Sequence, residues 1–219
     1  GNPINNEAIL NERAMIISNA QNKLDVLSDL IKDVPEKDKF YTIIYSGMGG
    51  APNDETDSDD NNDNYQEAQI DEICKILKKN NWTFSKYTSK SLKSKESRKT
   101  ILDEFEKGKN VQAIIAMKCL DEGLNIPKIR TAFITASNRY ERQFIQRAGR
   151  ILRREVTKDK AIIHDFFVFP FNQVNLKDSE SNHIIAELDR VKWFSELSLN
   201  KKETTDKIKD WSNDYPSLS

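Results

Sequence analysis

Five short apolar runs, rich in β-branched and aromatic residues, constrain the fold of this 219-residue chain more than any other feature. They lie at residues 40–45, 82–88, 111–116, 131–136 and 161–169. Runs of this length and composition predict buried β-strands, and helical patterns separate them. Strands that alternate with helices predict an α/β fold, in which helices cover both faces of a mostly parallel sheet.

Each helical pattern has one apolar face. The first spans residues 5–32, and its apolar residues recur every three or four positions: Ile16, Ala20, Leu24, Leu27 and Ile31. The second spans residues 65–80, the third residues 95–107 and the last residues 181–199. Gly108 directly follows the third helix, where a glycine commonly ends a helix in a left-handed conformation. These faces predict helices that pack on the sheet and a helical extension beyond it.

The elements divide the chain into three predicted regions. Residues 1–36 form an N-terminal helix that packs on the domain, residues 37–170 form the α/β domain, and residues 171–219 form the helical extension. Within the domain, residues 48–64 are rich in Gly, Asp and Asn, which predicts a flexible acidic loop. The spacing of an EF-hand calcium loop is absent from it. An inert insertion is the default interpretation, and a DNA-mimicking, autoinhibitory or partner-recruiting role is the alternative.

Hydropathy, cysteine content and charge exclude several classes of protein. No apolar run is long enough to span a membrane, and the N-terminus does not resemble a signal peptide. Cys74 and Cys119 lack metal-ligand spacing, which favours reduced thiols in a cytoplasmic protein. His164 and His183 are two lone histidines and predict no metal site. Residues 54–64 hold six acids and no base, so removing them from a net charge of -1 leaves +5 on the remainder, as a nucleic-acid binder can have.

The densest cationic stretch is residues 139–154, which contain six arginines and one acid. Guanidinium groups bind oxyanions through paired hydrogen bonds, so the expected partners are nucleotide phosphates or a nucleic-acid backbone. If the stretch is helical throughout, Arg147, Arg150 and Arg154 share one face. Gly149 lets another backbone approach closely beside them. A solvated basic helix with ion pairs to its neighbours is the alternative interpretation.

Three segments resemble motifs of the superfamily-2 helicases and translocases. Residues 146–153, Gln-Arg-Ala-Gly-Arg-Ile-Leu-Arg, are similar to motif VI, which reads Q/H-R-x-G-R-x-x-R in the family. Residues 117–127 are similar to motif V, and Ser46 with Gly47 stands where motif IV ends its strand. The resemblance covers residues 11–169 and implies the second, C-terminal RecA-like domain of such a protein, so that the α/β domain over residues 37–170 is expected to have the RecA-like, P-loop NTPase-type fold. Motif VI looks closest to the restriction-enzyme and excision-repair branches, which act on duplex DNA.

The resemblance also implies roles for single residues. The catalytic residues are the arginine fingers that reach the γ-phosphate of ATP, Arg150 and Arg153. The cofactor-binding residues are Gln146 as nucleotide sensor, Arg147 as a brace for motif V, and Gly123 and Asn125 beside the ribose and γ-phosphate. The residues expected to contact nucleic acid are Ser46, Gly47, Ser89 and Lys118. Two departures weaken single contacts, since Asn125 stands where the family has Asp and Met117 where a Thr is common.

The sequence lacks two motifs that ATP hydrolysis requires. It contains neither a phosphate-binding loop G-x-x-x-x-G-K-[ST] nor an acidic magnesium box on a strand, and phosphoryl transfer requires both. We therefore expect ATP with Mg²⁺ to be held mainly by an N-terminal RecA-like domain of the same polypeptide, and this chain alone to be inactive as an ATPase. Duplex DNA is the expected partner ahead of RNA, and no membrane partner is expected. A RecA-like module that binds nucleic acid or protein without catalysis is the alternative, supported by Asn125 and Met117.

Overall fold

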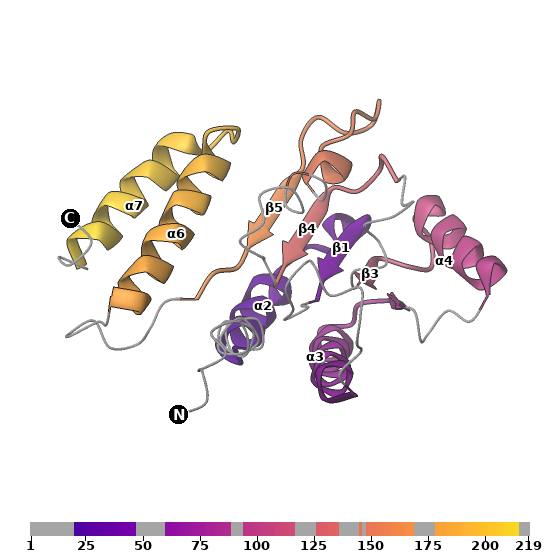
Figure 1. Ribbon diagram of the computed structural model, residues 1–219. Helices are drawn as coiled ribbons and strands as arrows, with labels where there is room; N and C mark the ends of the chain where they lie inside the picture. Colours follow the sequence, from indigo (N-terminus) through magenta and orange to yellow (C-terminus); the bar gives the residue numbers. More distant parts are fainter. Residues whose placement is uncertain are drawn as a thin grey trace. The chain divides into compact units, whose positions relative to one another are not determined.

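The computed structural model describes residues 20–46, 60–88, 94–116, 126–135, 145, 148–168 and 178–214 of the chain (Figure 1). The chain divides into two compact units. One comprises Gly1–Ser137 with Arg142–Phe166, and the other Asn138–Glu141 with Phe167–Ser219. The first unit holds the sheet and the second holds two helices, so each is described by itself.

The sheet of the first unit has five strands in the order β2-β3-β1-β4-β5, and every pairing between them is parallel. The strands are β1 (Thr42–Tyr45), β2 (Phe84–Tyr87), β3 (Ala113–Ala116), β4 (Thr131–Ile134) and β5 (Ile162–Asp165). Each lies inside an apolar run of the sequence. In the register of the sheet, Ile44 of the central strand pairs with Ile115 on one side and Phe133 on the other. The predicted parallel α/β fold is confirmed.

The helices follow the apolar periodicity of the sequence. They are α2 (Asn22–Lys32), α3 (Asp60–Lys79), α4 (Lys95–Lys107), α6 (Asp178–Ser195) and α7 (Lys201–Asp214), with a short 3-10 helix η1 (Glu36–Asp38). One difference concerns the predicted loop over residues 48–64, because α3 begins at Asp60 and takes the last part of it. The Gly, Asp and Asn content of the segment predicted a loop and did not indicate this helix start.

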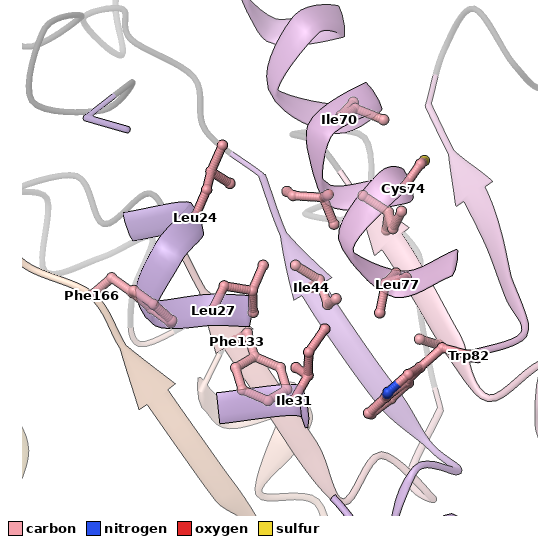
Figure 2. Close-up of a cluster of buried hydrophobic side chains, with 13 residues drawn as sticks. Leu24, Leu27, Ile31, Ile44, Ile70, Cys74, Leu77, Trp82, Phe133 and Phe166 are labelled. Atoms are coloured by element: carbon pink, nitrogen blue, oxygen red, sulfur yellow. The ribbon is translucent and has the colours of Figure 1, made fainter. Parts of the chain in front are cut away.

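Helices α2 and α3 cover one face of the sheet (Figure 2). Their apolar faces meet the side chains of Ile44, Ile115 and Phe133 in one buried cluster. The helix residues in it are those of the predicted stripes: Leu24, Leu27 and Ile31 from α2 and Ile70, Ile73, Cys74 and Leu77 from α3. Apolar surface removed from water stabilises the fold by about 25 cal/mol per Å². This cluster therefore holds the strands and both helices together.

The second face of the sheet is buried as well. Successive side chains of a strand point to opposite faces, and the residues that alternate with the first cluster are also buried: Ile43, Tyr45, Ile114, Ala116, Ala132 and Ile134. Phe105 of α4 and Ile151, the last helical residue of the arginine stretch, are fully buried outside the first cluster. Both faces are therefore shielded from water, as the sequence predicts.

Gly108 ends α4 in the left-handed conformation that the sequence predicts, with φ at 62°. Tyr41, just before β1, also has a φ of 62°, although it carries a side chain. Its ring packs edge-on against Phe105 at 6.0 Å between centroids, with Lys128 and Arg130 above it. A Cβ added at Gly108 lies 2.4 Å from the hydroxyl oxygen of Tyr41. The glycine is thus required by both its backbone and its neighbour.

Replacing Gly108 by alanine should lower the free energy of unfolding by about 1–3 kcal/mol, because a left-handed residue with a Cβ is strained and Tyr41 must move. Chemical denaturation of the purified chain measures this. The same substitution in a Tyr41→Ala background should lose only the backbone part, about 1 kcal/mol. Equal losses in the two backgrounds are the result that contradicts the contact with Tyr41.

The second unit is a pair of helices, α6 and α7, that contact each other. Within α6, Arg190 and Glu187 form an ion pair of 2.8 Å whose side chains are at most 10% exposed. Leu197 and Leu199, in the turn between the helices, are exposed. In the part of the chain that the structure describes, none of the helices has the length and apolar character needed to cross a membrane.

Candidate functional site

In the described part of the arginine stretch, the helix ends at Ile151. Residues 145 and 148–151 are helical, and Ala148 and Ile151 are buried, which anchors the helix to the domain. Arg150 is half-buried on the last turn, whereas Arg153 and Arg154 are exposed beyond it. The condition for a shared helix face, that the stretch is helical as far as Arg154, is therefore not met.

The side chain of Lys158 binds the end of this helix. The ammonium group of Lys158 donates a hydrogen bond of 2.8 Å to the carbonyl of Ile151, the last helical residue. It also donates to the carbonyls of Pro127 at 2.7 Å and Ile129 at 3.1 Å. Partial burial lowers the pKa of Lys158 below its usual value. No sequence motif marks Lys158, and the sequence analysis missed it.

Lys158 belongs to a small hairpin that follows the helix. Glu155 and Lys158 form an isolated antiparallel bridge, and the amide of Lys158 donates to the carbonyl of Glu155 at 3.0 Å. The guanidinium of Arg130 donates to the carbonyl of Thr157 at 3.0 Å. Arg130 directly precedes β4, so the hairpin lies beside the start of that strand. At its tip, Val156 is 99% exposed.

Of the segment that resembles motif V, the structure describes only the last two residues, Ile126 and Pro127, which precede β4. Ile126 is buried, and so is Ile129, two residues beyond the segment. The course of the segment between β3 and Ile126 stays a prediction.

At the end of β1, Ser46 lies where the resemblance to motif IV places it, but its side chain faces inward. It is 2% exposed, and its hydroxyl donates a hydrogen bond of 2.9 Å to the amide oxygen of Gln69 on α3. Its backbone amide donates to the carbonyl of Ala116, the last residue of β3. A contact between Ser46 and nucleic acid stays a prediction, and one made by the hydroxyl requires the bond to Gln69 to open.

The remaining predicted site residues lie outside the described residues: Gln146, Arg147, Gly123, Asn125, Gly47, Ser89 and Lys118. Their roles stay predictions. The structure thus describes Arg150, Arg153 and Ser46 of the predicted set, and Lys158 links Ile151, the residue after Arg150, to the end of the motif V segment. Among the described residues there is no group of three or more His, Cys, Asp or Glu side chains placed to hold a metal.

Gly149 is exposed on the arginine helix, and a Cβ built on it meets no atom of the described residues within 4 Å. Packing inside the described part of the chain therefore does not explain this glycine. The predicted close approach of another backbone needs a neighbour from elsewhere.

A comparison with known protein families finds a match over part of the chain. Residues 62–155, which include the motif V and motif VI segments, match the helicase conserved C-terminal domain. This part of the chain is therefore similar to a helicase C-terminal domain. The resemblance stated from the sequence is confirmed.

Two curated relatives and one solved structure illustrate the likeness. A helicase-related protein of Sulfolobus islandicus filamentous virus is 28% identical over 52% of this chain and 21% of its own length. The DNA 3'-5' translocase XPB2 of Sulfurisphaera tokodaii is 39% identical over 30% of this chain and 14% of its own length. The C-terminal domain of the DEAD-box protein Dbp5 is similar with a TM-score of 0.48 and 16% identity, over 88% of this chain and 92% of that one. The alignments span only a small part of the two curated relatives.

Proposed function

We propose that this chain is the C-terminal half of an ATP-dependent DNA helicase or translocase, that it supplies arginine fingers and part of the nucleic-acid track, and that it is inactive as an ATPase alone. The observation that carries the proposal is the placement of the arginines. Arg150 stands on the last turn of a helix anchored in a helicase C-terminal domain, and exposed Arg153 follows it by three residues. Guanidinium groups held this way suit an anion presented from outside the domain.

The chain's own share of the chemistry is electrostatic. Phosphoryl transfer builds up negative charge around the transferred group, and an arginine aimed at that group stabilises the charge. ATP with Mg²⁺, held mainly by an N-terminal RecA-like domain, supplies the phosphoryl group. Arg150 and Arg153 contribute positive charge from this side of the cleft, with Gln146, Gly123 and Asn125 beside the nucleotide. Opening and closing of the two domains converts hydrolysis into movement along nucleic acid.

Contacts to nucleic acid are proposed at the segments that follow the strands. In the sequence, Gly47 comes just after β1, Ser89 just after β2 and Lys118 just after β3. Binding through such loops is made mainly to phosphates and weakens as salt rises. The likeness of the motif VI spelling to restriction and repair enzymes favours duplex DNA over RNA. XPB2, to which part of the chain is similar, is named as a DNA translocase.

The test compares ATP hydrolysis by the intact protein, in which this chain follows a domain with a phosphate-binding loop, with hydrolysis by this chain alone. The intact protein should hydrolyse ATP, and duplex DNA should stimulate it more than RNA of the same length. The isolated chain should not exceed a buffer blank, since it has no phosphate cradle of its own. If the intact protein shows no turnover with either nucleic acid, the motor is contradicted and the non-catalytic binding module, which the departures at Asn125 and Met117 favour, takes its place.

A further inference from the structure

We propose that Lys158 is a positioning residue that fixes the end of the arginine helix against the segment leading into β4, and thereby sets where Arg150 and Arg153 stand. The kinetic consequence of this proposal rests on the proposed function above. The structural part, that one ammonium group ties two motif-bearing segments together, stands on the geometry of the described residues alone.

The three carbonyls bound by Lys158 come from two segments far apart in the sequence. Pro127 ends the motif V segment, Ile129 lies two residues beyond it, and Ile151 ends the arginine helix. A lysine ammonium has three N–H donors, so all of them are satisfied by backbone oxygens. The bonds to Pro127 and Ile129 join residues that are too far apart in the sequence for a local turn to explain them.

The helix end gives a reason for a cation at this point. The last carbonyls of a helix have no partner within the helix and carry the negative end of its dipole. The ammonium of Lys158 meets the carbonyl of Ile151 there, at 2.8 Å. A neutral side chain of the same length offers neither the charge nor three donors. Lysine therefore suits this position better than a neutral side chain does.

A second cation, Arg130, also links the hairpin to the start of β4. Arg130 donates from the start of β4 to the carbonyl of Thr157, and its own carbonyl accepts the amide of Ile162 at 2.8 Å. Lys158 donates from the hairpin back to the segment before β4. The hairpin and the strand start thus hold each other through reciprocal bonds. Ile129 and Ile151, two of the residues whose carbonyls Lys158 binds, are both buried.

The hydrogen bonds of Lys158 bear on the two arginines because these residues are neighbours of Ile151 in the chain. Arg150 directly precedes Ile151, and Arg153 follows it by two residues. A shift of the Ile151 carbonyl moves the backbone that carries both side chains. A displacement of about 1 Å in a group that positions the chemistry can lower a rate by about a hundredfold. Lys158 therefore acts on the reaction through the arginines and does not itself touch the nucleotide.

The structural part is tested on this 219-residue chain by amide hydrogen exchange. Lys158→Met keeps an apolar stem and removes the ammonium group. The amide of Leu152, which is bonded to the carbonyl of Ala148 at 2.8 Å, should exchange about tenfold faster, because the helix end opens more often. Lys160→Met, at an exposed lysine two residues on, is the matched control and should leave this amide unchanged.

Lys158→Arg provides a second variant should the methionine variant not fold. It keeps the charge, but a planar guanidinium cannot direct its donors at three oxygens around one point, so the Leu152 amide should still exchange faster than in the control. Exchange rates in the Lys158 variants equal to those of Lys160→Met overturn the proposal.

The kinetic part uses the intact protein at saturating ATP. Lys158→Met should lower kcat by about tenfold with little change in KM, because ground-state binding of ATP is made mainly elsewhere. In a background that carries both Arg150→Ala and Arg153→Ala the same substitution should lower kcat no further, since Lys158 acts through these two arginines. A full additional tenfold loss in that background, or an unchanged kcat beside faster local exchange, overturns the positioning role. Absence of turnover in the unmodified protein instead contradicts the proposed function, and the exchange data still decide whether the tie exists.

Discussion

Replacing Arg150 by alanine should lower the ATP turnover of the intact protein by about a thousandfold, the contribution typical of an arginine finger. Alanine has the highest helix propensity, and Arg150 is flanked in the helix by the buried anchors Ala148 and Ile151. The helix should therefore persist, so that the loss reports the missing guanidinium. Because the finger acts on charge that develops in the transition state, kcat should fall while ATP still binds.

The measurement is duplex-DNA-stimulated hydrolysis at saturating ATP, accompanied by direct titration of ATP binding. Arg154→Ala is the matched control, since Arg154 lies outside the motif VI positions and is exposed beyond the helix. It should retain turnover within about threefold, as expected for a surface charge away from the transferred group. Arg150→Lys should recover only part of the activity, because an ammonium lacks the planar fork of the guanidinium. Equal losses in the Arg150 and Arg154 variants contradict the finger assignment.

Much of the fold follows from hydrophobic periodicity, which is a local property of the sequence. The five apolar runs predict five strands, and each strand is found inside its run. The stripe of Leu24, Leu27 and Ile31 predicts the face of α2 that is buried, and Gly108 predicts the end of α4. These features were predictable because a side chain's burial is fixed by its position in a repeating backbone. The strand order was not, since it depends on which strands meet.

The candidate site was predicted less completely, because its details depend on contacts between distant segments. The sequence analysis left open whether the arginine stretch is helical as far as Arg154, and the structure ends the helix at Ile151, where Lys158 donates to its carbonyl. Ser46 was expected at a nucleic-acid surface by its place after a strand, yet Gln69 of α3 satisfies its hydroxyl inside the fold. Neither partner could be found by spacing in the sequence. The motif spelling located the site, and the tertiary contacts define its shape.

The core prediction with the largest expected effect is that Phe133→Ala should lower the free energy of unfolding of this chain by about 3–5 kcal/mol. Phe133 is 1% exposed at the middle of β4, where it pairs in register with Ile44 and His164. Its ring stacks on the imidazole of His164 at 4.6 Å between centroids and joins the cluster formed by α2 and α3. Truncation removes these contacts and leaves a cavity that the strands on both sides cannot fill.

Urea denaturation followed by circular dichroism measures this loss as a lower midpoint. Phe133→Leu should recover most of it, to within about 1.5 kcal/mol of the unmodified chain, because it restores apolar volume without the ring. Val156→Ala is the control for removing an apolar side chain from the surface, since Val156 is 99% exposed, and it should change stability by less than about 0.5 kcal/mol. A Phe133→Ala loss no larger than that of Val156→Ala contradicts the core described here. The arginine helix packs on the same domain, so a large loss at Phe133 also means that the arginines keep their places only while this core is intact.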